Sequence, residues 1–247
     1  MKAHSYLERG AQLGNITAKV HLAHMHLEGS HPSASKQTAF TLFREISSHR
    51  LPAVHLNLST CYRLGWGTPV NLNLYQHWLL KATEGDVEKD LQGHYVYLAK
   101  LELAQRYSDG LYGIKVNYTE AREIFSTSPA LLPHHQAWYG YLLAQGLGGR
   151  QDEKGGLKLL QESYEQGAVL ASFLLSQYYT DIARKITPPK KEDLAIAMGW
   201  IGMTDRHKDK KYLEEDHRVA LEKMLVWVKG FVKHVHNGSD GNDMILF

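Results

Sequence analysis

The chain has almost no cysteine, no marked excess of either charge and no long apolar run. Its single cysteine, Cys61, excludes an intramolecular disulfide and any cysteine-based zinc site within one chain. The 28 basic and 26 acidic residues leave a formal net charge of +2, so no long-range field attracts nucleic acid. No window approaches the roughly 18 consecutive apolar residues of a membrane helix. We therefore expect no nucleic-acid partner and no membrane span. Any partner must be recognised by local features of the protein surface.

The N-terminal residues, MKAHSYLERGAQLGN, lack the apolar stretch of a secretory signal. As given, the chain is expected to be cytoplasmic. It would be periplasmic if it were a processed fragment of a longer protein.

A pattern of small, leucine and aromatic residues recurs along the chain. The first residue, usually small, is followed by leucine or tyrosine four positions later, by a small residue five positions later and by tyrosine, histidine or leucine eight positions later. Glycine usually stands eleven positions later, which is position twelve when the first residue is counted as one. The starts lie at Ala18, Val54, Ala99, His135 and Ala171, spaced by 36, 45, 36 and 36 residues. A second set of similar positions follows each start after about 21 residues. Apolar spacings of three and four predict two amphipathic helices in each repeat.

Glycines stand where the first helix of four repeats must end, at Gly29, Gly65, Gly110 and Gly146. Glycine adopts the left-handed conformation that closes a helix without a steric penalty. The small residues within the helices allow two backbones to approach closely, while leucine, tyrosine and tryptophan fill the space between pairs. A single pair cannot bury its apolar face, so the pattern predicts a stack of pairs.

The predicted fold is an all-α, right-handed α/α superhelix, a solenoid of two-helix repeats with a C-terminal capping helix. Residues 1–207 form the repeat array, with a half repeat at 1–14 and repeats that start near 18, 54, 99, 135 and 171. Residues 208–236 have an apolar stripe at helical spacing and are expected to cap the array. Residues 237–247 form a tail.

The template, best kept in LAQRYSDG and NLYQHWLLKATEGD, resembles the Sel-1-like repeat family, which is related to the tetratricopeptide repeats. The resemblance covers roughly residues 3–204. It departs from the template at His135, at Ile182 in place of a turn glycine, and at nine added residues around DVEKDLQGHYVY. The resemblance implies a non-catalytic scaffold without a cofactor, which binds a partner protein or peptide as this family commonly does in bacterial envelope, secretion, motility and signalling assemblies.

Three histidines, His21, His24 and His26, lie within six residues. His26 takes the place of a tyrosine in three other repeats, which predicts that it faces the core. His21 and His24 could bind a metal only with a further ligand, and Glu28 is the nearest acidic residue. An enzymatic or metal-binding module that uses His21, His24 and groove residues is therefore the alternative function. A repeat segment of a larger envelope or secreted protein is another.

No catalytic residues or phosphate loop are predicted. The glycine clusters GWG (65–67) and GLGG (146–149) lack the Lys-Ser/Thr of a P-loop, and no sequence feature places a histidine opposite a nucleophile. Cys61 is predicted to be a small, semi-buried thiol. Trp66, just after its turn glycine, is either a packing residue or an exposed aromatic at a binding surface.

The resemblance places the first helix of each repeat on the concave face. Positions three, seven, ten and eleven of the template would then face a groove of mixed apolar and uncharged polar character, or lie buried between repeats. Such a groove suits a helix or an extended peptide, because apolar anchors give affinity and amides or hydroxyls fix register. The predicted partner-binding residues are His24, Arg63, Trp66, Gln105, Tyr141, Phe173 and Gln177.

Overall fold

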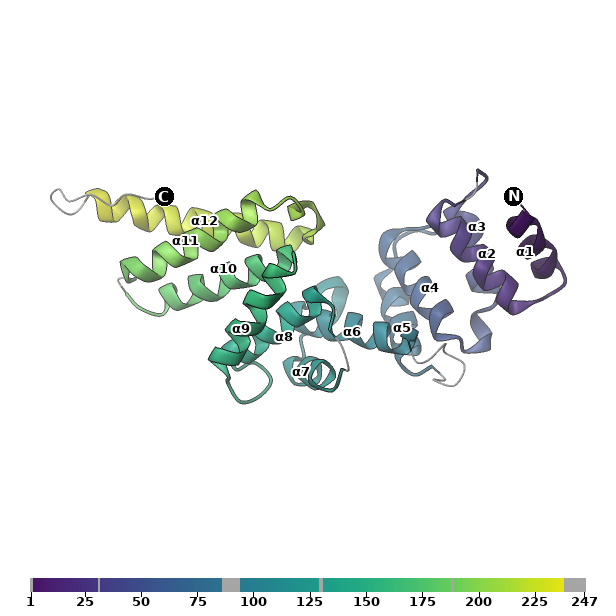
Figure 1. The fold of residues 1–247 in the computed structure, drawn as a ribbon, viewed down its shortest axis with the longest axis horizontal. Coiled ribbons are helices and arrows are strands. Elements are labelled where there is room, and N and C mark those ends of the chain that lie inside the picture. Colours follow the sequence, from purple (N-terminus) through teal and green to yellow (C-terminus); the bar gives the residue numbers. More distant parts are fainter. Residues whose placement is uncertain (1, 31, 86–93, 129–130, 188, 238–247) are drawn as a thin grey trace. The chain divides into compact units, whose positions relative to one another are not determined.

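The computed structural model describes residues 2–30, 32–85, 94–128, 131–187 and 189–237. Within these ranges the chain consists of α-helices and short 3₁₀ turns, with no β-strand, which confirms the predicted all-α repeat fold (Figure 1). The helices form two compact units, residues 1–128 and 129–247. Each unit is described separately.

The described residues of the first unit form seven α-helices, and helices that follow one another in the chain pack together. α2 packs on α3, α4 on α5, and α6 on α7, which are the pairs expected from the repeats near 18, 54 and 99, while α1 packs on α2 as the half repeat requires. The helices are α1 (Lys2–Gln12), α2 (Ile16–Glu28), α3 (Lys36–Glu45), α4 (Pro52–Leu64), α5 (Leu72–Thr83), α6 (His94–Asp109) and α7 (Tyr118–Thr127).

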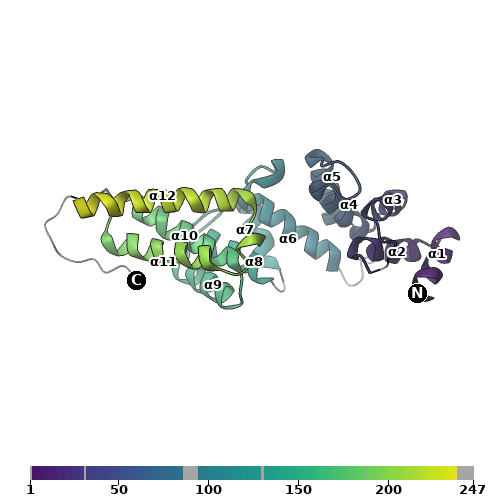
Figure 2. The ribbon, with the colours of Figure 1, turned by 90° about the horizontal axis from the view of Figure 1, so that it is seen from above.

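The second unit contains α8 (Pro133–Gln145), α9 (Glu153–Glu165), α10 (Val169–Arg184), α11 (Lys191–Arg206) and α12 (Glu215–Asn237). α8 pairs with α9 and α10 with α11. Figure 2 shows α12 lying along α10 and α11, both of which it contacts, as expected of a capping helix. Because Ile182 replaces the turn glycine, α10 continues to Arg184.

The capping helix begins at Glu215 rather than at residue 208. Residues 208–214 contain a short 3₁₀ turn, Lys210–Tyr212. The positive end of the helix dipole favours the acidic Glu215 and Asp216 in the first turn and disfavours the lysines that precede them. Residues 238–247 of the predicted tail lie outside the described part of the chain.

The turn glycines close the first helices as the sequence predicts. Gly29, Gly65, Gly110 and Gly146 have φ angles of 71°, 69°, 70° and 71°, all in the left-handed region. A side chain at these positions would strain the backbone, which is why glycine ends each of these helices.

In three of the pairs a backbone hydrogen bond across the turn fixes the start of the second helix. The backbone N–H of the N-cap residue donates to a carbonyl near the end of the preceding helix: Asn71 to Tyr62, Asn117 to Tyr107 and Asp152 to Leu143, each at 2.9 Å. The side chains of these N-cap residues also accept an N–H from the first turn of their helix. These bonds satisfy donors that a helix start would otherwise leave unpaired.

His26 performs this role differently in the first pair. Its ring is buried, and its Nδ1 accepts the backbone N–H of Ser35, the N-cap of α3, at 3.2 Å. The imidazole therefore fills the position of the tyrosines in later repeats and also replaces the carbonyl acceptor. This confirms the prediction that His26 faces the core.

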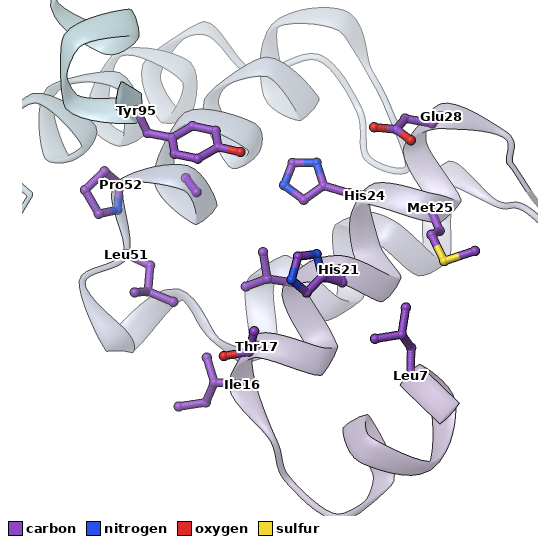
Figure 3. A pocket seen from close by; sticks show the side chains of 12 residues that line it. Leu7, Ile16, Thr17, His21, His24, Met25, Glu28, Leu51, Pro52 and Tyr95 are labelled. Carbon is purple, nitrogen blue, oxygen red and sulfur yellow. The ribbon is translucent and has the colours of Figure 1, made fainter. Parts of the chain in front are cut away.

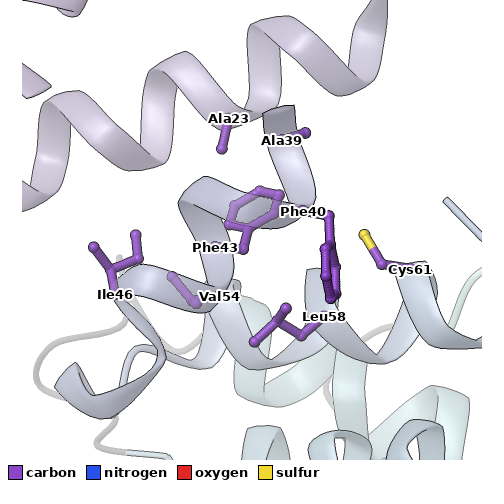
Figure 4. Close-up of a cluster of buried hydrophobic side chains, with 8 residues drawn as sticks. All are labelled: Ala23, Ala39, Phe40, Phe43, Ile46, Val54, Leu58 and Cys61. Atoms are coloured by element: carbon purple, nitrogen blue, oxygen red, sulfur yellow. The ribbon is translucent and has the colours of Figure 1, made fainter. Parts of the chain in front are cut away.

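Small residues bring paired helices into close contact. A Cβ atom built on Gly156 of α9 would lie 2.4 Å from the Gly140 carbonyl oxygen and from the Ala144 backbone nitrogen of α8. Large side chains fill the remaining space, as Phe40, Phe43 and Leu58 do in the buried cluster of Figure 4. Cys61 belongs to this cluster, and burial raises the pKa of its thiol to about 11.

Candidate partner-binding groove

An open groove with a volume of about 760 Å³ lies within the first unit (Figure 3). One face of α2 forms its floor, because residues spaced by three and four share a face of a helix. Leu7 of α1 contributes one wall, and the start of α4 with Tyr95 of α6 contributes the other. The lining residues are Leu7, Ile16, Thr17, Val20, His21, His24, Met25, Glu28, Leu51, Pro52, Ala53 and Tyr95.

The groove is mostly apolar, and its polar groups are unevenly distributed. Ile16 and Thr17 lie at the start of α2, Leu51 and Pro52 belong to the start of α4, and His24, Met25 and Glu28 lie toward the end of α2 (Figure 3). Thr17, His21 and Glu28 are exposed. A ligand in this groove would therefore meet mostly apolar surface near the start of α2 and more hydrogen-bonding groups toward its end.

His24 is a polar groove residue with a buried ring nitrogen. Its ring stands edge-on to Phe43 at a centroid distance of 5.5 Å, and its buried Nε2 atom has no hydrogen-bond partner within the described residues. Burial lowers the pKa of His24, with His21 adding to the shift and the Glu28 carboxylate opposing it. At neutral pH the ring is therefore an uncharged imidazole, which can form a hydrogen bond with a bound segment.

The histidines do not assemble a metal site in the part of the chain that the structure describes. There, no three His, Cys, Asp or Glu side chains come together in a group that could hold a metal ion. His21 and His24 instead line the groove with Glu28. The described residues therefore give the metal-binding alternative no support.

Two other predicted contact residues of the first unit pack against the chain itself. The Arg63 guanidinium lies 5.3 Å from the ring centre of Tyr112. Trp66 packs on the cluster of Figure 4, with the Lys36 ammonium 4.2 Å above its ring. Trp66 is thus a packing residue that keeps part of its surface exposed.

The remaining predicted residues lie on α6, α8 and α10, and three of them are buried. Gln105, Tyr141 and Phe173 are 9%, 6% and 2% exposed, so they offer little surface to a partner. Phe173 is covered by the cap, since the His217 ring of α12 lies 4.9 Å from it. Gln177 is partly buried. The template treated these first helices as lining an open face, but α10 packs against both α8 and α12.

In the first repeat the template marks Val20, His24, Leu27 and Glu28. Val20, His24 and Glu28 line the groove, whereas Leu27 packs on the buried cluster of Figure 4. The template missed Leu51, Pro52 and Tyr95, which come from elements far along the chain from α2. The aromatic density of HYVY, just after the inserted segment, was the only signal for Tyr95.

None of the described helices is both long enough and apolar enough to span a membrane. The chain matches no curated protein. Among solved structures it is similar to a Sel1 repeat protein from Oxalobacter formigenes, with 20% sequence identity and a TM-score of 0.54 over 83% of this chain and 82% of that one. It is also similar to c5321, a protective antigen of uropathogenic Escherichia coli strains that displays an SLR fold, with 20% identity and a TM-score of 0.47 over 92% of this chain and 56% of that one.

The sequence model of the Sel1 repeat matches most of the repeats seen in the sequence. It matches residues 1–15, 17–48, 52–87, 98–127 and 136–167, which together make up more than half of the chain. The match leaves out residues 171–207, where the structure has the pair α10 and α11. The helix pairing, the turn glycines and this match agree, and the chain belongs to the Sel1 repeat family.

Proposed function

We propose that the chain is a non-catalytic scaffold that binds a segment of a partner protein in the groove along α2. Sel1 repeat proteins are generally scaffolds for protein interactions and are typically not enzymes. The observation that supports this site is an open groove with a mostly apolar lining and a few polar groups. Such a surface binds a peptide by burying its apolar side chains and orients it through a small number of hydrogen bonds.

The groove residues are better suited to binding than to catalysis. The unpartnered Nε2 of His24 is available to a ligand, but no serine or cysteine nucleophile lines the groove with it. Cys61 is buried elsewhere, and burial keeps its thiol protonated at neutral pH.

A matched pair of substitutions tests the site. Thr17 is an exposed residue near the start of α2 in the groove, and Thr38 is an exposed residue near the start of α3 that does not line it. Thr17→Trp should fill the apolar part of the groove and abolish capture of the physiological partner in a pull-down, while Thr38→Trp should leave capture unchanged. Circular dichroism should show equal helix content in both variants. Equal capture by the two variants would place the partner elsewhere.

A further inference from the structure

The groove has one fixed charge, and its sign indicates the kind of partner that fits. Among the described residues that line it, Glu28 is the only aspartate, glutamate, lysine or arginine. The Glu28 carboxylate is exposed and forms no salt bridge with a described residue. By contrast, Lys19 on the same helix is paired with Glu45, Nζ to Oε2, at 2.7 Å. The cation of α2 is thus engaged by α3, and the anion is left available in the groove.

The position of Glu28 strengthens this negative end. Glu28 is the last residue of α2, where the carbonyl groups of the final turn carry the negative end of the helix dipole. His24, one turn earlier, does not compensate the charge at neutral pH, because burial holds its pKa below the ordinary value. A cation is therefore the complementary group at this end of the groove.

The opposite end is uncharged and mostly apolar. Ile16, Val20, Leu51 and Pro52 line it with apolar side chains, and Thr17 adds one hydroxyl. An apolar group of the partner is therefore complementary to this end. From Ile16 to Glu28 the helix rises by about 18 Å, at 1.5 Å per residue. An extended peptide covers that distance with about five or six residues at 3.3 Å each.

We propose that the groove binds an extended segment of a partner protein that carries an apolar anchor and, about five or six residues away, a lysine or arginine that pairs with Glu28. This proposal rests on the proposed function and adds the chemistry of the partner. The apolar anchor fills the space around Ile16 and Pro52, and a backbone or side-chain group of the segment satisfies His24 Nε2.

Random peptides displayed on phage provide the probe. Peptides selected on the purified full chain should carry an apolar residue and a Lys or Arg at a recurring spacing, and they should lose binding to the Thr17→Trp variant. Glu28→Lys should weaken them by about tenfold or more, because it replaces attraction with repulsion at the same site. Selection on the Glu28→Lys variant should instead enrich acidic residues at that position.

Glu84→Lys is the matched control, since Glu84 is an exposed residue at the end of α5 that does not line the groove. It makes the same charge change and should leave binding unchanged. Peptides that are blocked by Thr17→Trp but show no basic preference, or that tolerate Glu28→Lys, would overturn the charge proposal and leave the proposed function standing. If no selected peptide is blocked by Thr17→Trp, both proposals fail.

Discussion

The contact between α8 and α9 allows a sharp test of the role of small residues. Gly156→Ala adds a single methyl group inside α9. In an open helix this change is favourable by about 1 kcal/mol, because glycine loses more backbone entropy than alanine. Here the new Cβ would lie 2.4 Å from two backbone atoms of α8, far inside van der Waals contact. Since neither atom is on a flexible side chain, the helices must separate.

Adding atoms to a well-packed contact lowers the free energy of unfolding by about 1–3 kcal/mol. A clash with backbone atoms should cost about 3 kcal/mol, because the backbone cannot move aside as a side chain can. After the gain in helix propensity, Gly156→Ala should destabilise the chain by about 2 kcal/mol. Gly199→Ala in α11 is the matched control, because a Cβ there meets no atom within 4 Å. The control should be stabilising by about 0.5–1 kcal/mol.

Thermal unfolding followed by far-ultraviolet circular dichroism distinguishes the two variants. For a chain of this size 1 kcal/mol corresponds to about 2–4 °C in the unfolding midpoint, so the variants should differ by about 5–12 °C. A Gly156→Ala variant as stable as Gly199→Ala would refute the close approach of α8 and α9.

Three further predictions concern the core, pH and the cap. Trp78→Ala should destabilise by about 2–3 kcal/mol in urea unfolding, because the partly buried ring packs on His55 and the cluster of Figure 4; an unchanged midpoint would refute that packing. Burial lowers the pKa of His24 in the folded chain, so just below pH 6.5 the unfolded chain binds more protons than the folded one. The free energy of unfolding should therefore decrease as pH falls through that value, and it should decrease by less in His24→Gln. Equal decreases in the two proteins would contradict this prediction. Deleting residues 208–247 should expose Phe173 and cause aggregation, seen by light scattering, whereas a monomeric and equally stable truncation would show that the cap is dispensable.

The repeat fold was predictable because its determinants are local and recur at fixed spacing. Gly29 and Gly146 mark helix ends by a backbone requirement that only glycine meets easily, and the position of His26 identified a core residue by comparison with other repeats. The start of α12 was predicted seven residues too early, because the apolar stripe continues past the true helix start. The helix dipole disfavours lysines and favours acidic residues in a first turn, so the lysines before Glu215 and the acidic first turn indicate the true start of α12.

The groove was only partly predictable, because it depends on which faces the neighbouring helices leave open. Val20, His24 and Glu28 lie on one face of a single helix, so spacing grouped them, but it also included Leu27, which packs on the buried cluster of Figure 4. Tyr95 joins them only through the packing of helices distant in the chain. Phe173 occupies a template position expected to be open, but α12 covers it. A pattern of residues within one repeat cannot predict which neighbouring helix covers that repeat.

Photocrosslinking from the groove tests the central claim most directly. A benzophenone amino acid at Thr17, or at Thr38 as the control, is activated by light in the cells that produce the chain. If the partner lies along α2, a covalent adduct forms from Thr17 with the protein retained in the pull-down, and little or none forms from Thr38. Adducts of that protein from Thr38 at equal or greater yield, or capture of the partner without any adduct from Thr17, would contradict it.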